Sequence, residues 1–342
     1  MNRRCLYHIM KWQYVITHHA NKRLPSARVY HWFILLSALL LVSCTPQKTT
    51  QIRVGTNLWP GYEILYVARE QGAFKGIPIR FMEYRNATQV IDNLLKGNIN
   101  MAALTLDEVI RVVNEGLDIK IIWVFNVSNG ADALITNTTI TQLSDIKGKR
   151  IGVERTAVGE YMLHRVLQHA ALTLDDITVV DIPAHKHVQG IANDSLDAVI
   201  TFEPYVHELA SLGFNTLFTS KDLPNEIIDV LAVQADFAQR NPELVGQFID
   251  AYAKQVSEVL HAFDKHIYYL NLRLKLDKDE LKSIYAGIEI PTPEQQLTLL
   301  RQTAKLQDNI TVYRSALGYN AAPKNKMLAA DIVDLQFLER VK

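Results

Sequence analysis

The side chains best able to do chemistry in this 342-residue chain are carboxylates in loops that follow short apolar runs. Among the positions expected to line a site, Arg155 is the one basic residue, and the acidic ones are Glu63, Asp107, Asp132, Glu203 and Asp229. An unpaired carboxylate in a cleft that loses its water is costly, so it should meet a cation, a hydrogen-bond donor or water. We therefore hypothesise a ligand that is neutral or carries an amine or amidine-like group, rather than a simple oxyanion.

The loop after the first predicted strand combines an amide, two aromatic rings and a glycine between residues 57 and 63. Ligand sites in α/β folds lie beyond the carboxyl ends of strands. We therefore expect Asn57, Trp59 and Tyr62 to contact a ligand, with Trp59 stacking on a flat or apolar group. The alternative is that the two rings only cover the core.

Two later loops have the same position after a predicted strand. Thr105 and Asp107 offer a hydroxyl and a carboxylate, although Asp107 serves equally as a helix cap. Thr156 is expected to cap the next helix, whose first amides are free to bind an anion or polar group. Thr156, Val158 and Gly159 are therefore candidate ligand residues.

Common catalytic motifs are missing from the sequence. It has no Gly-x-Ser-x-Gly elbow and no His-Glu-x-x-His helix. His185 and His187 have no evident third ligand, so we interpret them as part of a surface loop and predict no metal or other cofactor. We expect a protein that binds its ligand without catalysis.

The elements that must position these residues follow from hydrophobic periodicity. Short apolar runs alternate with helical patterns from Ile52 to Phe125, and a second, smaller series extends from Arg150 to Leu212. Such alternation predicts mainly parallel sheets flanked by helices. After about Asp236 helical patterns dominate. The sequence therefore predicts an α/β fold of two lobes with a helical C-terminal extension.

The first 43 residues predict a secretory signal. They contain six Lys or Arg and no acidic residue, and the apolar run Trp32 to Val42 is too short to span a bilayer. The run ends in Leu-Val-Ser-Cys, which resembles a bacterial lipobox and predicts that Cys44 carries a lipid and residues 44–50 form a tether. An incidental thiol is the alternative. The remaining chain has 30 basic and 36 acidic residues, which argues against nucleic-acid binding.

Six phrases in the chain resemble, in order, the solute-binding proteins of nitrate, sulfonate, taurine and thiamine-precursor ABC importers. They are GTNLWPGYE (55–63), LYVAREQGAF (65–74), GNINMAALTLD (97–107), SNGADAL (128–134), LSDIKGKRIGV (143–153) and DAVITFEPY (197–205). The resemblance implies a type II periplasmic-binding-protein-like fold whose lobes close on a ligand about two chain crossings. Lobe 1 would comprise residues 51–132 and 230–342, and lobe 2 residues 133–229.

The resemblance also implies further site residues and partners. Ser128, Asn129 and Asp229 would lie near the two crossings, and Glu203 would face the cleft. The protein would be an extracytoplasmic, membrane-anchored monomer that captures a small organic solute and delivers it to an ABC permease. The alternative is a sensory or accessory lipoprotein that reports the ligand to a membrane receptor, since both roles use ligand-gated closure.

Overall fold

The computed structural model describes residues 50–319 and 328–340, which belong to one compact unit, Thr50–Lys342. The predicted signal segment, Cys44 and nearly all of the predicted tether lie outside the described residues. Within the described ranges, the helices all fall short of the length and apolar character needed to cross a membrane.

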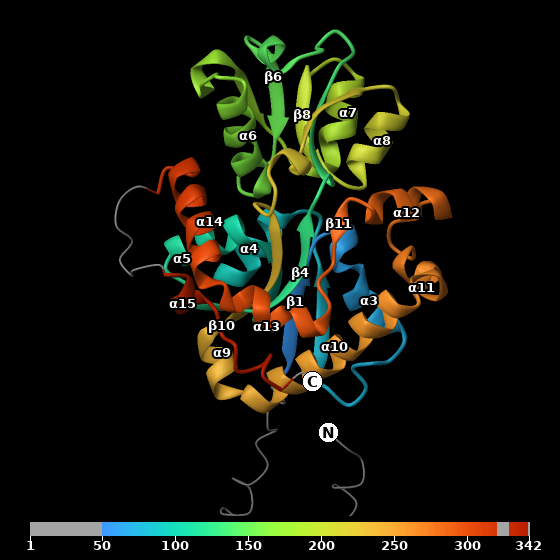
Figure 1. Cartoon of the computed structure of the whole chain (residues 1–342), viewed down its shortest axis with the longest axis vertical. Coiled ribbons are helices and arrows are strands. Elements are labelled where there is room, and N and C mark those ends of the chain that lie inside the picture. Colours follow the sequence, from blue (N-terminus) through green and yellow to red (C-terminus); the bar gives the residue numbers. More distant parts are fainter. Residues whose placement is uncertain (1–49, 320–327, 341–342) are drawn as a thin grey trace, which may run out of the picture. The chain divides into compact units, whose positions relative to one another are not determined.

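The first sheet has six strands in the order β11-β4-β10-β3-β1-β2 (Figure 1). Its strands are β1 (Ile52–Thr56), β2 (Ile79–Glu83), β3 (Met101–Thr105), β4 (Ile119–Ser128), β10 (Ile228–Gln234) and β11 (Ile288–Glu289). β1 is parallel to β2 and β3, whereas β10 is antiparallel to β3 and β4, and β11 is antiparallel to β4. β1 to β4 therefore share one direction, with β10 inserted against them.

The second sheet repeats this arrangement in the order β7-β6-β8-β5-β9. Its strands are β5 (Asp132–Thr136), β6 (Arg150–Val153), β7 (Thr178–Asp181), β8 (Ala198–Phe202) and β9 (Asn215–Thr219). β6 is parallel to β7 and β8, and β5 is antiparallel to both β8 and β9. Each sheet is thus mixed: β10 and β11 run against their neighbours in the first sheet, and β5 does so in the second.

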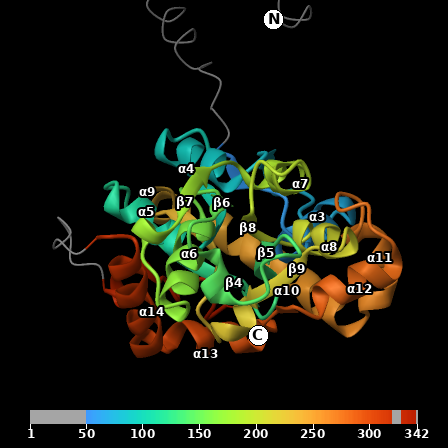
Figure 2. The same cartoon turned by 90° about the horizontal axis from the view of Figure 1, so that it is seen from above.

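Helices cover both faces of each sheet. Those that follow the strands of the first sheet are α3 (Glu63–Glu70), α4 (Ala87–Leu95) and α5 (Leu106–Asn114), and those of the second are α6 (Val158–His169), α7 (His187–Ala192) and α8 (Tyr205–Ser211). In the second sheet α6 packs on one face, and α7 and α8 pack on the other (Figure 2). Because both faces are covered, the central strand β3 is buried along its whole length.

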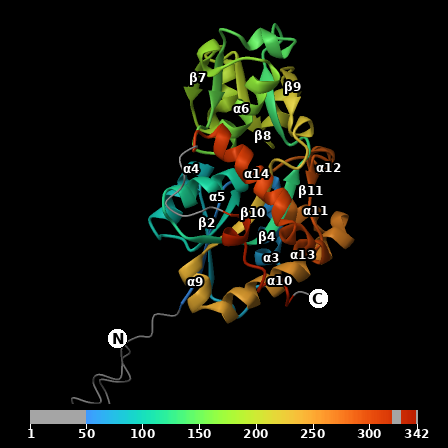
Figure 3. The ribbon, with the colours of Figure 1, turned by 60° about the vertical axis from the view of Figure 1, so that its left-hand side comes forward.

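The C-terminal part is helical and packs on the first sheet. It comprises α9 (Ala235–Arg240), α10 (Pro242–His261), α11 (Phe263–Leu270), α12 (Lys278–Tyr285), α13 (Pro293–Arg301), α14 (Thr303–Ala316) and α15 (Ala329–Ile332). α14 extends to α6 beside the second sheet (Figure 3). The rings of Tyr313 and Tyr161 meet there edge to face, with their centroids 4.3 Å apart. The predicted two-lobe α/β fold with a helical extension is confirmed.

Two chain segments join the sheets, one from β4 to β5 and one from β9 to β10. Ser128 Oγ and Ser220 Oγ are 2.7 Å apart, and Gly130 N donates to Ser220 Oγ at 2.6 Å. The two crossings are therefore bonded to each other. The first residue of β5 that pairs in the second sheet is Asp132, and the first residue of β10 that pairs in the first sheet is Ile228. We therefore propose that the boundaries between the lobes lie in these two crossings.

Candidate functional site

A narrow pocket lies at the carboxyl ends of strands from both sheets. Its cavity volume is about 20 Å³. The residues that line it are Asn57, Trp59, Tyr62, Ala87, Thr105, Glu108, Asp132, Ala157, Val158, Phe202 and Asp229. A smaller chamber of about 10 Å³ continues into the second lobe and shares Asp132, Ala157, Val158 and Phe202 with the first. We call the two together the cleft.

Tyr62 and Asp229 form the floor of the cleft on the first lobe. The Tyr62 hydroxyl donates to Asp229 Oδ1 at 2.6 Å. With its amide oriented to satisfy its neighbours, Asn126 donates to Asp229 Oδ2 at 2.9 Å and accepts from Trp59 Nε1 at 3.3 Å. Both oxygens of the buried Asp229 carboxyl are therefore engaged, and the two rings are fixed in place.

The start of α5 brings two more polar groups to the cleft. Thr105 is the N-cap residue, and Glu108 Oε2 accepts from the Thr105 backbone N–H at 2.9 Å. The Thr105 hydroxyl itself has no hydrogen-bond partner although the residue is only 6% exposed. A buried hydroxyl without a partner costs free energy, so this atom is available to a ligand.

The two lobes touch through several side chains around the cleft. Trp59 meets Phe202 edge to face, with ring centroids 5.8 Å apart. Thr88 donates through its backbone N–H to Glu154 Oε1 at 3.1 Å, and Arg111 Nη2 binds Glu160 Oε2 at 2.7 Å. These contacts join elements of the first lobe to elements of the second.

Burial raises the pKa values of five carboxyls in and around the cleft. It raises the pKa of Asp107 to about 6 and those of Asp132 and Glu203 to about 7. The pKa values of Glu108 and Asp229 lie well above their ordinary values, first because of burial and then because of neighbouring carboxylates. No Lys or Arg lines the described walls of either chamber, so no basic side chain there offsets the negative charge that these carboxyls carry when they ionise.

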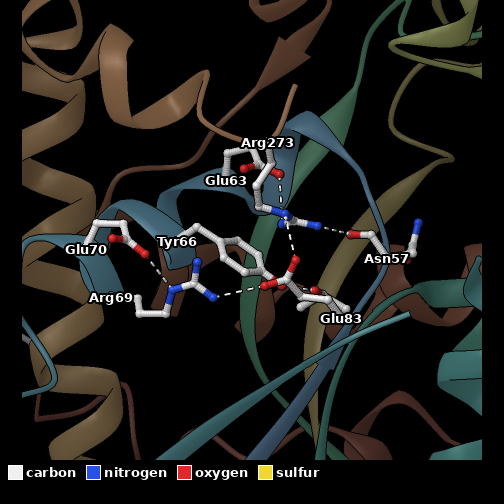
Figure 4. A network of polar contacts seen from close by, with 8 residues as sticks. Asn57, Glu63, Tyr66, Arg69, Glu70, Glu83 and Arg273 are labelled. Atoms are coloured by element: carbon white, nitrogen blue, oxygen red, sulfur yellow. Dashed lines mark hydrogen bonds and ion pairs between the residues drawn. The ribbon is translucent and has the colours of Figure 1, made fainter. Parts of the chain in front are cut away.

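The C-terminal helices contact the loop of residues 57–62, which we call the aromatic loop, and the start of α3 through Arg273 (Figure 4). Arg273, in the turn between α11 and α12, lies 3.7 Å from the ring centre of Tyr66 and binds Glu63 Oε1 at 3.0 Å. It also donates to the Asn57 carbonyl at 3.5 Å, and the Tyr285 hydroxyl donates to the Pro60 carbonyl at 2.7 Å. The extension therefore positions Asn57 to Tyr62.

The sequence profile described as "NMT1/THI5 like" matches residues 59–262, which is more than half of the chain. The chain belongs to the NMT1/THI5-like family. The taurine-binding periplasmic protein of Escherichia coli K12 is 21% identical over 274 residues, which cover 77% of this chain and 84% of that protein.

Solved structures show the same fold at low identity. The alkanesulfonate-binding protein SsuA from Xanthomonas axonopodis pv. citri, bound to MOPS, is 16% identical, with a TM-score of 0.69 over 83% of this chain and 98% of that chain. A desulfurization enzyme, DSZB, has a TM-score of 0.62 at 15% identity, over 84% of this chain and 98% of that chain. The family fold alone therefore does not separate binders from catalysts.

The structure brings part of the predicted set together. The predicted residues that line the cleft are Asn57, Trp59, Tyr62, Thr105, Val158, Gly159 and Asp229. The remaining predicted residues lie beside the cleft rather than in its walls; they are Asp107, Ser128, Asn129, Thr156 and Glu203. The family resemblance thus located the loops, and the walls depend on which way each side chain points.

The residues beside the cleft bind neighbouring protein groups. Ser128 binds Ser220, and Asn129 Nδ2 donates to Glu289 Oε1 at 2.6 Å. Thr156 shares a hydroxyl contact with Thr88, across the lobes. Glu203 Oε2 accepts from the His207 backbone N–H at 3.0 Å at the start of α8. We retain these residues as proposed supports of the site.

The expected helix caps were wrong in two places. The N-cap residue of α5 is Thr105 rather than Asp107, and that of α6 is Ala157 rather than Thr156. Each helix begins one or two residues away from the expected cap, because Asp107 already lies in the first turn of α5 and Thr156 bonds to the other lobe. Gly159 packs closely on Val153, where a Cβ would lie 2.8 Å from a methyl group.

The interpretation of residues 185–187 as a surface loop was also wrong for His187. This side chain is buried at the start of α7, and its Nε2 lies 3.1 Å from the Ile182 carbonyl. Burial lowers the pKa of His187 to about 4, so the ring is neutral. Within residues 50–319 and 328–340 no group of three His, Cys, Asp or Glu is arranged to hold a metal ion.

In the larger chamber, five wall residues were missing from the predicted ligand contacts: Ala87, Glu108, Asp132, Ala157 and Phe202. Asp132 was expected near the site but not as a ligand contact, and it pairs with Phe202 at the edge of the second sheet where β8 ends. The sequence signal for Asp132 was its place at the first residue of an antiparallel strand, which lies at the same edge as the ends of the parallel strands. For Glu108 the signal was the Thr-x-x-Glu capping pattern.

Proposed function

We propose that this chain is an extracytoplasmic solute-binding lipoprotein that captures a small organic solute in the cleft and delivers it to an ABC permease. The observation that carries the proposal is a pocket whose walls come from both lobes and hold buried polar atoms without partners, Thr105 Oγ1 and Asp132 Oδ2. Lobes that contact a ligand together are driven to close by it.

The wall chemistry favours a solute that is neutral or carries an amine or amidine-like group. Three carboxyls line the first chamber, Glu108, Asp132 and Asp229, and a simple oxyanion would add negative charge to them. The E. coli relative is named for taurine, which carries an ammonium group as well as a sulfonate. A solute of this kind would supply the positive charge that the described walls lack.

Membrane attachment belongs to the same proposal. A lipid on Cys44 would hold the unit near a permease, and a single lobe-closing monomer is sufficient to present the bound solute. A role in capture without catalysis agrees with the names of the relatives, which are binding proteins for taurine and alkanesulfonate.

The test is a binding and closure experiment on the form that begins at residue 45, without the lipid. Native mass spectrometry would identify a co-purified small molecule, and calorimetry with amines, amidines, nitrate and alkanesulfonates would define the class. We expect the radius of gyration from solution scattering to fall on adding a bound solute. Tight binding of nitrate with no binding of amines would contradict the proposed ligand class, and an unchanged envelope with every solute would contradict capture by closure.

A further inference from the structure

Asp132 occupies a special position in the cleft. It is the first residue of β5, at the crossing into the second lobe, and it is the carboxyl that lines both the larger and the smaller chamber. The side chain is 3% exposed, and its Oδ2 has no hydrogen-bond partner. A group in either chamber can therefore reach this carboxyl.

The other carboxyls around the cleft are already engaged by protein groups. Asp229 is bound by Tyr62 and Asn126, Glu108 by the Thr105 amide, and Glu203 by the amide of His207. Among the described carboxyls of the larger chamber, Asp229 has both oxygens bound and Glu108 has one, whereas Asp132 Oδ2 is buried without a partner. This difference separates it from its neighbours, which share the same burial and charge.

A second free polar atom lies in the opposite lobe. Thr105 ends β3, pairs with Asp229 across the first sheet and lines the larger chamber together with Asp132. Its Oγ1 is also without a partner. A primary ammonium group has three N–H donors and no acceptor, so it can serve a carboxylate oxygen and a hydroxyl oxygen at once.

We propose that Asp132 is the counter-ion for the ammonium group of a primary-amine solute, and that this ammonium joins Asp132 of the second lobe to Thr105 of the first. The inference rests on the proposed function and assigns the charge recognition to residues of the wall rather than to Glu203. The amine then acts as the bridge that favours closure. The rest of the solute extends towards Trp59.

The experiment compares Asp132→Asn with Glu203→Gln, two isosteric changes that each remove one carboxyl from the same acidic region. The probes are taurine, 4-aminobutanoate and 1,4-diaminobutane, each matched to its analogue with one amine fewer: ethanesulfonate, butanoate and butylamine. Calorimetry measures Kd for each pair. We expect Asp132→Asn to weaken the tightest amine probe by about 30-fold or more, because it removes a buried charged partner, and Glu203→Gln to weaken it less than about five-fold.

Thr105 supplies the second arm. Thr105→Val should weaken the same amine probe by about ten-fold, because a hydrogen bond to a charged group is lost, whereas Thr105→Ser should restore binding to within about three-fold. N-trimethylation of the amine probe should weaken binding as strongly as Thr105→Val, since the N–H donors are gone.

A merely structural role of Asp132 would give a different pattern. Removing a costly buried carboxyl should raise the thermal midpoint of Asp132→Asn at pH 8 while lowering amine affinity, so the loss of binding cannot come from unfolding. Equal effects of Asp132→Asn and Glu203→Gln would overturn the inference while leaving solute capture in place. Failure of every amine probe to bind the unaltered protein would overturn the inference, and it would overturn the proposed ligand class as well if neutral and amidine-bearing solutes also failed to bind.

Discussion

The hydroxyl of Tyr62 donates to Asp229 Oδ1 over 2.6 Å, although the two residues are 167 positions apart in the chain. Tyr62 follows the first strand, whereas Asp229 lies on β10, the strand that returns from the second lobe. One hydrogen bond therefore fastens the returning crossing to the aromatic loop of the cleft. Burial and the neighbouring carboxylate raise the pKa of Tyr62 well above its ordinary value, so it remains a donor.

Tyr62→Phe should lower the free energy of unfolding by about 1–3 kcal/mol, because it leaves one oxygen of a buried carboxyl without its donor. Urea denaturation followed by tryptophan fluorescence would measure the change. Tyr268→Phe is the matched control, since Tyr268 is 70% exposed. Equal midpoints for the two variants would show that the bond contributes nothing.

Stability without added solute should fall as pH rises from about 4 to 8. The pKa values of Asp132 and Glu203 are raised to about 7 and that of Asp107 to about 6 in the folded chain, so folded protein holds protons that unfolded protein has released. The contribution is most favourable below about pH 4 and is lost as pH passes through 6 to 7. Thermal midpoints across this range would measure it.

Glu203→Gln provides the control for this pH dependence. It removes one of the titrating groups and keeps an oxygen that can accept from the His207 amide, so the fall between pH 5.5 and 8 should become shallower. A midpoint that rises from pH 5.5 to 8 in the unaltered protein would contradict the expectation.

Glu160→Gln should loosen the closed form. Glu160 binds Arg111 across the lobes at 2.7 Å, and both side chains are less than one-fifth exposed. Loss of about 1 kcal/mol of closure energy corresponds to a Kd about five-fold weaker for any bound solute. Calorimetry would measure it, with Glu258→Gln, in the exposed pair to Lys254, as the control.

Salt offers a second check on the same ion pair. Screening should reduce the difference between the unaltered protein and Glu160→Gln as ionic strength rises, but only in part because the pair is mostly covered. Equal Kd values for the unaltered protein and Glu160→Gln at every salt concentration would exclude this ion pair as a contact that stabilises the closed form.

Arg273→Met should destabilise the protein by about 3–5 kcal/mol, because it leaves the fully buried Glu63 without its cation. Adding Glu63→Gln should recover much of that loss. Arg273→Lys should not substitute fully, since a Lys cannot lie flat on Tyr66 while reaching Glu63 and the Asn57 carbonyl. Denaturation of the unaltered protein, Arg273→Met, Glu63→Gln and the double variant would form a double-mutant cycle that measures the coupling between the two side chains.

Local patterns were sufficient to predict the alternating elements and the loops that form the cleft. β1 begins and ends at the expected residues, and the loop with Trp59 and Tyr62 lies where it was expected. The sequence could not show that β10 enters between β3 and β4, since that pairing joins residues more than 100 positions apart. The position of Asp132 beside Phe202 likewise depends on a long-range pairing, that of β5 with β8.

Side-chain direction was the other unpredictable part. His187 directly follows His185 and Lys186 in a short polar stretch, and only the packing of α7 against the second sheet buries it. Arg273 carries no local signal for a role in the cleft, because its partners Glu63 and Asn57 are brought to it by the folded C-terminal helices. Such contacts emerge only after the elements have packed.

The two sheets differ in when their strands become available as the chain is synthesised from its N-terminus. All five strands of the second sheet come from one stretch, Asp132–Thr219, whereas the first sheet keeps a gap between β3 and β4 until Ile228–Gln234 arrives. A chain delivered from its N-terminus can therefore complete its second lobe before its first. Until then the edges of β3 and β4 can pair with the wrong strands, which makes this interval the stage of folding most exposed to aggregation.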